Sequence, residues 1–291
     1  MLKILAPAKI NLTLEVLGRR PDGYHEVCTI IQAINLCDVL ELELSPDISV
    51  EADIPALSAE DNLVHRAALL LKEFNDKPKG ACLKLTKHIP EAAGLGGGSS
   101  DAAAALIGLN KLWRLGLSTE DLLPIAAKLG SDVPFFLYSG AALAEGRGEL
   151  VTPLKKGIKA WVVLLEPSLP PLPDKTQRLY SSLSPSSFTK GEFTAKLADV
   201  LNQARVPDAT LLFNVFESVA FEVFQTLSDY RERFLGAGAE WVHLAGSGPT
   251  LYTLVENRRK AEALTQALTN QGLKSYLVQT FNQQHSSVEN L

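Results

Sequence analysis

The stretch that most restricts how this chain can fold lies at residues 90–106. Four glycines occur within the five positions Gly94–Gly98, and Ser99, Ser100 and the alanine-rich run Ala102–Leu106 follow closely. Glycine permits positive φ angles and lets the backbone approach a ligand closely, while alanine and leucine are strong helix formers. The sequence therefore predicts a glycine loop that runs into a helix, with Ser99 and Ser100 capping its first turn.

A glycine loop at the start of a helix is typical of a phosphate-binding site, because unpaired N–H groups and the positive end of the helix dipole meet there. The alternative is a flexible glycine–serine linker, but linkers lie among polar residues, and this loop lies between a strand-like run at 81–89 and an apolar helix. The P-loop is excluded because no Gly-Lys-Ser/Thr ends the stretch. The dinucleotide fingerprint, counted from Gly94, is excluded because Ser99 stands at its third glycine.

Composition narrows the class of protein. The chain has 291 residues, of which 46% are hydrophobic and 21% charged, which is ordinary for a globular protein with room for two domains. A net charge of −5 argues against a nucleic-acid binder. We expect no membrane span and reduced cysteines at 28, 37 and 82. Because the N-terminus lacks signal-peptide character, we expect a cytoplasmic location, or a plastid-like stroma without a transit peptide. The five histidines show no metal-ligand spacing.

Polar and apolar residues alternate strictly from Lys9 to Val16, which predicts a strand with Lys9 and Asn11 on one polar face. Taken alone, this segment favours a half-solvated edge strand with a salt-bridging lysine. A Pro-Asp-Gly turn at 21–23 then presents Tyr24 and His25 side by side. An aromatic ring beside an imidazole suits a planar base, although a tyrosine that merely covers the sheet is equally compatible.

Asp132 is the next candidate for chemistry. It follows Gly130, which is expected to end a helix with a capping box at Ser118, and it precedes the apolar run Val133–Leu137, read as a buried strand. A carboxylate at such a loop end is often functional. The competing interpretation is that Asp132 only caps a helix or a turn, a position at which aspartate is common.

The second half of the chain predicts a small α+β domain with an antiparallel sheet. A rigid proline-rich connector at 167–173 leads to a helix that begins with Lys175, Thr176 and Tyr180. The further expected elements are a strand at 161–165, a long helix at 211–227, strands at 241–244 and 251–255 around a glycine turn at 246–249, a helix at 259–270 and a strand at 275–279. The polar tail at 283–291 is expected to fray.

Four motifs occur in a fixed order, and together they resemble the GHMP small-molecule kinases. They are Pro7-Ala8-Lys9-Ile10-Asn11-Leu12, the stretch from Pro90 to Ala103, Gly130-Ser131-Asp132-Val133-Pro134, and Gly246-Ser247-Gly248-Pro249-Thr250. The resemblance covers nearly the whole chain. It implies a two-domain α+β fold, with an N-terminal ATP-binding domain at 1–153, a C-terminal domain at 154–291 and the active site in the cleft between them.

Within that family, Asp22-Gly23-Tyr24-His25 and the triple-glycine loop are similar to members that act on a cytidylated alcohol. The resemblance implies transfer of the ATP γ-phosphoryl group to the 2-hydroxyl of 4-(cytidine 5'-diphospho)-2-C-methyl-D-erythritol, in isoprenoid precursor synthesis. By similarity, Asp132 is the general base and Lys9 its electrostatic partner. The acceptor residues implied are Asn11, Tyr24, His25, Thr176 and Tyr180.

The resemblance also implies where ATP and Mg²⁺ bind. The ATP-binding residues by similarity are Pro90, Gly94, Leu95, Gly96, Gly97, Gly98, Ser99 and Ser100, and Ser99 or Ser100 helps to place Mg²⁺. The chain departs from the family pattern at Glu91-Ala92-Ala93, where the entry to the loop is often richer in glycine, and at Val215, where relatives usually carry an acid. The proline-rich segment also fits the related substrate loop poorly, which weakens the assignments of Thr176 and Tyr180.

Two other functions stay open. One is another GHMP kinase, of the homoserine or mevalonate type, and the other is a nucleotide-binding protein without turnover. The partner expected is a small molecule that carries cytidine diphosphate, rather than nucleic acid or a membrane, and the protein is expected to be a monomer or a weak homodimer.

Overall fold

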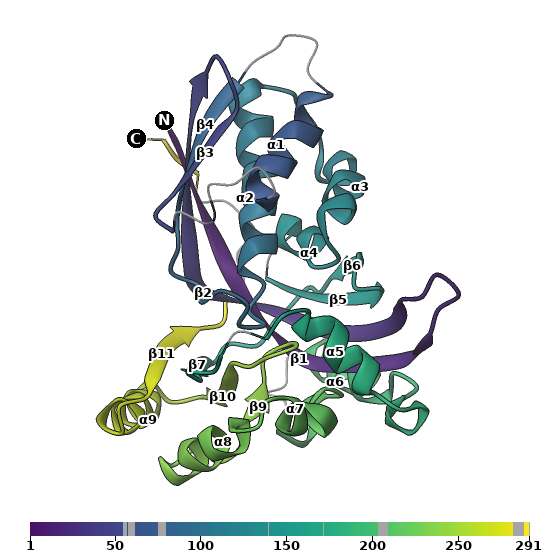
Figure 1. Ribbon diagram of the computed structural model, residues 1–291, viewed down its shortest axis with the longest axis vertical. Helices are drawn as coiled ribbons and strands as arrows, with labels where there is room; N and C mark the ends of the chain where they lie inside the picture. The colour runs from purple at the N-terminus through teal and green to yellow at the C-terminus, as the bar shows by residue number, and fades with distance from the viewer. Residues whose placement is uncertain are drawn as a thin grey trace.

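The computed structural model describes residues 1–54, 57, 62–74, 80–138, 140–170, 172–202, 209–281 and 288–290. These residues form two lobes, each built on a β-sheet (Figure 1). Eight described strands make up the larger sheet, in which β12-β1-β2-β4-β3 form the main path, and four strands make up the smaller one in the order β11-β7-β10-β9.

The first lobe contains most of the larger sheet and a group of helices on one face of it (Figure 1). Its elements are β1 (Leu2–Arg19), β2 (His25–Ser45), β3 (Ser49–Ala52), α1 (Leu63–Lys72), β4 (Gly80–Thr86), α2 (Gly97–Trp113), α3 (Thr119–Leu129), α4 (Val133–Tyr138), β5 (Ala141–Gly146) and β6 (Leu150–Pro153). The expected capping box of α3 is confirmed, because Ser118 and Asp121 exchange side chain–backbone hydrogen bonds. Asn62 caps α1.

Strand β1 lies in the interior of the larger sheet and not at its edge. It pairs with β2 along most of its length, with β8 in parallel and with β12. Its polar face is buried against the second lobe: Glu15 is 0% exposed and accepts hydrogen bonds from the amides of Phe193 and Thr194. The half-solvated edge strand that the segment alone favoured is therefore wrong.

The two termini lie close together (Figure 1), because β12 (Val288–Asn290) pairs antiparallel with Leu2–Ile4. The prediction of a frayed tail is wrong for residues 288–290. The backbone of β1 offers them a free edge to pair with, which a polar composition does not reveal. Residues 283–287 and 291 of that prediction lie outside the described part of the chain.

Helix α2 begins at Gly97, within the stretch that was expected to form the glycine loop. Gly96 is its N-cap, with a left-handed φ of 74°, and no side chain caps the helix. Ser99 and Ser100 thus lie inside the first turn, and the prediction that they cap it is wrong. Low intrinsic propensity did not keep the glycines out of the helix, because α2 packs against the sheet and α1.

Residues Val133–Tyr138 form α4, so the strand predicted there is wrong. A short, fully apolar run does not distinguish a buried strand from a buried helix. Pro134 is compatible with the helix because proline is tolerated in the first turn. As a result, Asp132 directly precedes a helix that is buried under α2 and α3.

The second lobe contains the smaller sheet, whose strand pairs are all antiparallel. Its elements are β7 (Trp161–Glu166), α5 (Lys175–Ser182), a 3-10 turn at Pro185–Ser187, α6 (Glu192–Asn202), a 3-10 turn at Ala209–Leu211, β8 (Phe213–Asn214), α7 (Glu217–Val223), α8 (Leu227–Gly236), β9 (His243–Leu244), β10 (Leu251–Val255), α9 (Arg258–Asn270) and β11 (Lys274–Gln279). Of the proline-rich connector, Pro171 lies outside the described residues.

The long helix predicted at 211–227 is wrong. Its first part is the short strand β8, which joins the larger sheet beside β1. The buried side chain of Asn214 donates to the carbonyl oxygens of Leu244 and Gly246, and its own oxygen accepts from the amide of Phe216. These tertiary hydrogen bonds hold an extended conformation that an apolar periodicity cannot predict.

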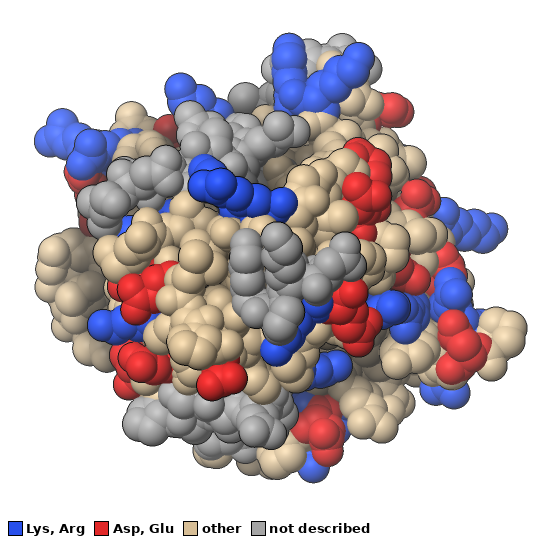
Figure 2. All heavy atoms as spheres, turned by 90° about the horizontal axis from the view of Figure 1, so that it is seen from above, with Lys and Arg blue, Asp and Glu red and all other residues tan. Residues whose placement is uncertain are grey.

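The boundary predicted between residues 153 and 154 stays a prediction; it falls between β6 and β7, although β8 and β12 return to the first sheet. Among the described residues, no helix combines the length and apolarity that a membrane crossing needs. Figure 2 shows Lys and Arg interspersed with Asp and Glu on the face seen from above. The three cysteines are free and partly buried.

Candidate active site

A cavity of about 820 Å³ lies where the two lobes meet. Side chains from β1, the turn between β1 and β2, the loop before α4, helix α5 and the glycine turn before β10 all reach it. Its lining includes Lys9, Asn11, Tyr24, His25, Ser99, Asp132, Arg147, Thr176, Tyr180, Gly246 and Ser247. The structure thus brings together both predicted catalytic residues and all five predicted acceptor residues.

Lys9 and Asp132 form an ion pair, with Nζ and Oδ2 separated by 3.5 Å. Lys9 is held in place because its Nζ donates to Asn11 Oδ1 at 2.7 Å, and Asn11 in turn donates to Thr29 Oγ1 at 2.8 Å. The Lys9 side chain is 6% exposed and the Asp132 side chain 37%. The pair therefore has a fixed, buried cation and a carboxylate that opens into the cavity.

The glycine loop borders a second cavity, of about 430 Å³, which is lined by Pro90, Gly94, Gly96, Gly97, Gly98 and Ser99 together with Lys87 and Asp101. Ser99 lines both cavities, so they meet at the first turn of α2. The first amides of a helix have no partner within it, and here they lie beside this junction. Leu95 and Ser100 do not line either cavity; Leu95 contributes its carbonyl oxygen, which accepts from the Lys9 amide at 2.9 Å.

The glycines of the two lobes pack directly against each other at this junction. A Cβ on Gly94 would lie 2.0 Å from the carbonyl oxygen of Ala245, and a Cβ on Gly246 would lie 2.8 Å from the carbonyl oxygen of Gly94 and 2.9 Å from Lys9 Nζ. Both glycines also have positive φ angles. Glycine is thus required at both positions by space and by conformation.

Tyr24 and His25 lie in the same cavity as Asp132. The His25 ring stacks on Tyr180, with centroids 4.7 Å apart and planes inclined by 19°. Tyr24 is 54% exposed, and the guanidinium of Arg147 lies 4.8 Å from its ring centroid. His25 Nε2 is buried without a hydrogen-bond partner, and burial, with the charge of Arg19, lowers the pKa of His25.

Tyr180 and Thr176 both project from α5. Burial, with the charge of Asp132, raises the pKa of Tyr180. Thr176 Oγ1 lies 3.2 Å from Ser247 Oγ, so the start of α5 contacts the glycine turn of its own lobe. Thr176 and Tyr180 thus reach the cavity from α5, whereas Ser99 is the one predicted ATP-binding residue that lines it among the described residues.

Sequence reasoning missed three charged groups near the glycine loop. Lys87 forms a buried ion-pair cluster with Asp38 and Asp101. Arg147 stands in the turn between β5 and β6, and Lys175 contacts both glycine turns. The Gly-Arg-Gly sequence around Arg147 was a usable signal for a tight turn with an exposed cation, whereas nothing local to Lys87 or Lys175 indicates their partners.

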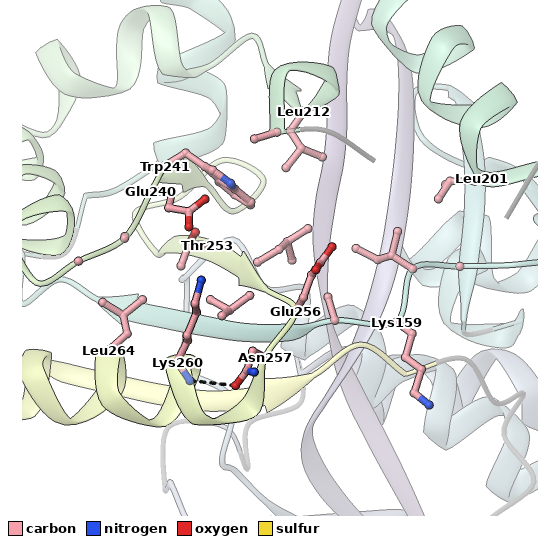
Figure 3. Close-up of a pocket in the computed structure, with 18 of the residues that line it drawn as sticks. Lys159, Leu201, Leu212, Glu240, Trp241, Thr253, Glu256, Asn257, Lys260 and Leu264 are labelled. Atoms are coloured by element: carbon pink, nitrogen blue, oxygen red, sulfur yellow. Dashed lines mark hydrogen bonds between the residues drawn. The ribbon is translucent and has the colours of Figure 1, made fainter. Parts of the chain in front are cut away.

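A further cavity, of about 590 Å³, is lined only by residues of the second lobe (Figure 3). Figure 3 shows the side chains of Glu240, Glu256 and Lys260 around it, beside the Trp241 ring. Opposed charges give this cavity no clear preference for a phosphate, and no predicted site residue lines it. The interlobe cavity is therefore the candidate active site.

Two family models match the chain, the N-terminal domain of GHMP kinases at residues 62–140 and the C-terminal domain of GHMP kinases at residues 196–274. The chain belongs to the GHMP kinase family. It is a small-molecule kinase, which takes its phosphoryl group from ATP. Within the family models lie the glycine loop, Asp132 and the glycine turn of the second lobe.

Similar GHMP kinases are known in bacteria and among solved structures. The 4-diphosphocytidyl-2-C-methyl-D-erythritol kinase of Dehalococcoides mccartyi is 49% identical over 280 residues, covering 96% of this chain and 98% of the relative. That of Geobacillus kaustophilus is 39% identical over 98% of this chain and 99% of its own length. A crystal structure of 4-(cytidine 5'-diphospho)-2C-methyl-D-erythritol kinase, 33% identical, has a TM-score of 0.81 and covers 97% of this chain and 100% of its own.

Proposed function

We propose that this GHMP kinase phosphorylates the 2-hydroxyl of 4-(cytidine 5'-diphospho)-2-C-methyl-D-erythritol with ATP, a step of isoprenoid precursor synthesis by the non-mevalonate pathway. The observation that carries the proposal is the single cavity that joins the Lys9–Asp132 pair to Tyr24 and His25. The names of the similar kinases support the same acceptor. The proposal places the enzyme in the cytoplasm, as a monomer or weak homodimer.

Asp132 accepts the proton of the acceptor hydroxyl in this proposal, because it is the carboxylate that pairs with Lys9 and opens into the interlobe cavity. Phosphoryl transfer has a loose transition state with charge on the equatorial oxygens, so positioning and cations dominate catalysis. The Lys9 ammonium, fixed by Asn11, supplies positive charge at the same point. The first amides of α2 lie within the glycine-loop cavity and bind the phosphates.

Mg²⁺ is proposed to accompany ATP, and its fit depends on few protein ligands. The described residues contain no group of three His, Cys, Asp or Glu that could hold a metal alone, but Mg²⁺ commonly binds through phosphates and one or two side chains. Ser99 fits because it lies at the junction of the two cavities, whereas the Ser100 hydroxyl is buried away from both. When bound there, Mg²⁺ neutralises charge on the phosphate oxygens.

The cytosine ring is proposed to stack on the exposed face of Tyr24. It does not lie between His25 and Tyr180, because those two rings already contact each other. Tyr180 supports His25 with one face of its ring, and its proposed role as a second stacking face for the base would use the other face. A neutral imidazole can donate from one nitrogen and accept at the other, and the lowered pKa of His25 favours that neutral form at pH 7. Its Nε2 lacks a hydrogen-bond partner but is enclosed, so the edge of the base reaches it only if neighbouring side chains shift.

Mass spectrometry of the product tests this function directly. Incubation with ATP, Mg²⁺ and the cytidyl alcohol should add one phosphoryl group to the alcohol, while homoserine and mevalonate should stay unmodified. Turnover of either alternative acceptor at a comparable rate would move the chain to another branch of the family. Absence of any ATP-dependent product would favour a nucleotide-binding protein without turnover. The pairing of Lys9 with Asp132 argues against that alternative.

Replacing Tyr24 by alanine should weaken the acceptor specifically. Stacking of a base on an aromatic side chain contributes roughly 1–3 kcal/mol, so the KM for the cytidyl alcohol should rise about tenfold or more while the KM for ATP stays unchanged. Steady-state kinetics with each substrate varied in turn measures both values. Equal effects on the two substrates would place Tyr24 outside the base pocket.

A further inference from the structure

Lys175, the first residue of α5, connects the two glycine turns. Its Nζ donates to the carbonyl oxygen of Ala92 at 2.7 Å and also to the carbonyl oxygen of Gly248. No carboxylate is paired with this ammonium within the described residues. Burial, with the nearby charge of Lys9, lowers the pKa of Lys175 to about 8. The Lys175 ammonium is thus held between the carbonyl oxygens of Ala92 and Gly248, at a position where burial and the charge of Lys9 disfavour its protonated form.

The backbone around these two oxygens has little freedom to shift. Gly94 and Gly246 approach each other so closely that neither has room for a Cβ. The Thr250 amide also donates to the carbonyl oxygen of Ala93 at 3.3 Å. A displacement of the glycine loop would therefore be transmitted to the turn of the second lobe, and Lys175 bonds to both.

Ala92 has an unusual conformation at the entry to the glycine loop. Its φ is 51°, in the left-handed region that a residue with a Cβ rarely adopts and that glycine adopts freely. The entry to the loop is thus strained at the residue whose carbonyl oxygen Lys175 binds. The hydrogen bond from Lys175 to that oxygen stabilises the left-handed conformation of Ala92 against this strain.

Helix α5 carries the acceptor side of the cavity. Thr176 follows Lys175 directly and contacts Ser247, and Tyr180 lies on the same helix and stacks on His25. Both residues line the cavity that contains Asp132. A change in the position of the Lys175 end of α5 would therefore move acceptor-binding side chains relative to the glycine loop.

We propose that Lys175 is a positioning residue that fixes the phosphate-binding loop relative to the acceptor-binding helix, and that the left-handed Ala92 depends on it. This inference rests on the proposed function at one point only, the assumption that α5 takes part in binding the acceptor. Lys175 does not line either cavity of the site. Its effect on transfer is therefore exerted through the backbone of the loop and through α5.

The test compares four proteins: wild type, Lys175→Met, Ala92→Gly and the double variant. Methionine keeps the length of the side chain and removes its donors. We expect Lys175→Met to raise the KM values for ATP and for the cytidyl alcohol about tenfold each, and to weaken binding of a non-hydrolysable ATP analogue to the same extent in calorimetry. Ala92→Gly alone should change each value less than twofold. In the Lys175→Met background it should recover most of the lost ATP affinity, because glycine adopts the left-handed φ without support.

The matched control is Lys155→Met, which removes an exposed lysine that forms no hydrogen bond or ion pair with the described residues and should leave every value unchanged. A Lys175→Met variant that binds both ligands as wild type does would overturn the positioning role. Equal effects of Ala92→Gly in the two backgrounds would overturn the dependence of Ala92 on Lys175. Failure of the wild type to phosphorylate the cytidyl alcohol would instead reject the proposed function, and binding of the ATP analogue would still report on the loop.

Discussion

Two of the lysines beside the glycine loop form ion pairs with carboxylates, and the surroundings of these pairs differ. Lys9 pairs with Asp132, whose side chain is 37% exposed and opens into the interlobe cavity. Lys87 pairs with Asp38 and Asp101, whose side chains are 0% and 3% exposed. One pair leaves its carboxylate accessible to a substrate, whereas the other encloses both carboxylates. An ion pair between lysine and aspartate therefore has a different role at each of these two positions beside the loop.

The buried cluster holds the chain that leads into the glycine loop. Besides its contact with Lys87, Asp38 accepts hydrogen bonds from the amides of His88 and Ile89, which directly precede Pro90. The acid on β2 thereby fixes the last residues before the loop to the central sheet. The comparison teaches that the accessible pair can exchange a proton with a ligand, while the enclosed cluster sets where the loop begins.

Asp132→Ala tests the accessible pair and should have the largest effect. Loss of a positioned general base typically lowers a rate by about 10²–10⁴-fold, so turnover should fall by that factor while binding of ATP stays close to that of wild type. Because Asp132 is partly exposed and Lys9 keeps its hydrogen bond to Asn11, the unfolding free energy should change by less than the ~3–5 kcal/mol typical of a fully buried pair that loses one partner. Turnover assays and urea unfolding of one preparation measure both quantities, and near-normal turnover would remove Asp132 from the chemistry.

Lys87→Met should show the reverse pattern, with its main effect on stability. Removing one partner of a buried ion pair leaves uncompensated charge and typically costs about 3–5 kcal/mol. Here two carboxylates lose the ammonium that they share, so the midpoint of urea unfolding should fall sharply. Lys155→Met, at an exposed lysine, is the control for removal of a positive charge. An unchanged midpoint would show that the cluster does not stabilise the fold.

The same contrast explains which parts of the site could be predicted from the sequence. The alternation of β1 put Lys9 on a polar face, and the place of Asp132 after a helix-ending glycine made it a candidate, but the catalytic roles of both came from the family resemblance. The cluster of Asp38, Lys87 and Asp101 was missed because its members belong to β2, the segment after β4 and α2, and only tertiary pairing brings them together.

The fold shows the same limit of prediction. The strands β7, β10 and β11, the capping box of α3 and the helix at α9 were predicted close to their observed bounds, whereas β1 extends well beyond the predicted 9–16. The errors at α4 and at β8 concern short apolar segments whose conformation is set by neighbours. The helix at Gly97 likewise starts early because of packing against the sheet, against the preference of its own residues. Sequence patterns thus predicted the elements whose conformation depends on their own residues, and failed where tertiary packing determines the conformation.

Asp101→Asn should give the smallest effect and should sharpen the comparison through pH. Burial and the charge of Asp38 raise the pKa of Asp101 to about 7, although Lys87 opposes them. In the unfolded chain this carboxyl titrates near its ordinary value of 3.8, so between these two pH values the native state binds more protons than the unfolded state. The contribution of Asp101 to the unfolding free energy of the wild type therefore decreases as the pH rises from 3.8 to about 7.

An asparagine carries no titrating proton, so the variant should lack this loss of stability. Each unit of pKa shift corresponds to ~1.4 kcal/mol. About two pH units of the range from pH 5 to pH 8 lie below the native pKa of about 7, so the variant should gain about 2–3 kcal/mol relative to wild type over that range. Urea unfolding of both proteins at the two pH values measures the difference. Parallel pH dependence of the two proteins would mean that Asp101 stays ionised in the fold, and the enclosed cluster would then resemble the accessible pair in charge state and differ from it only in exposure.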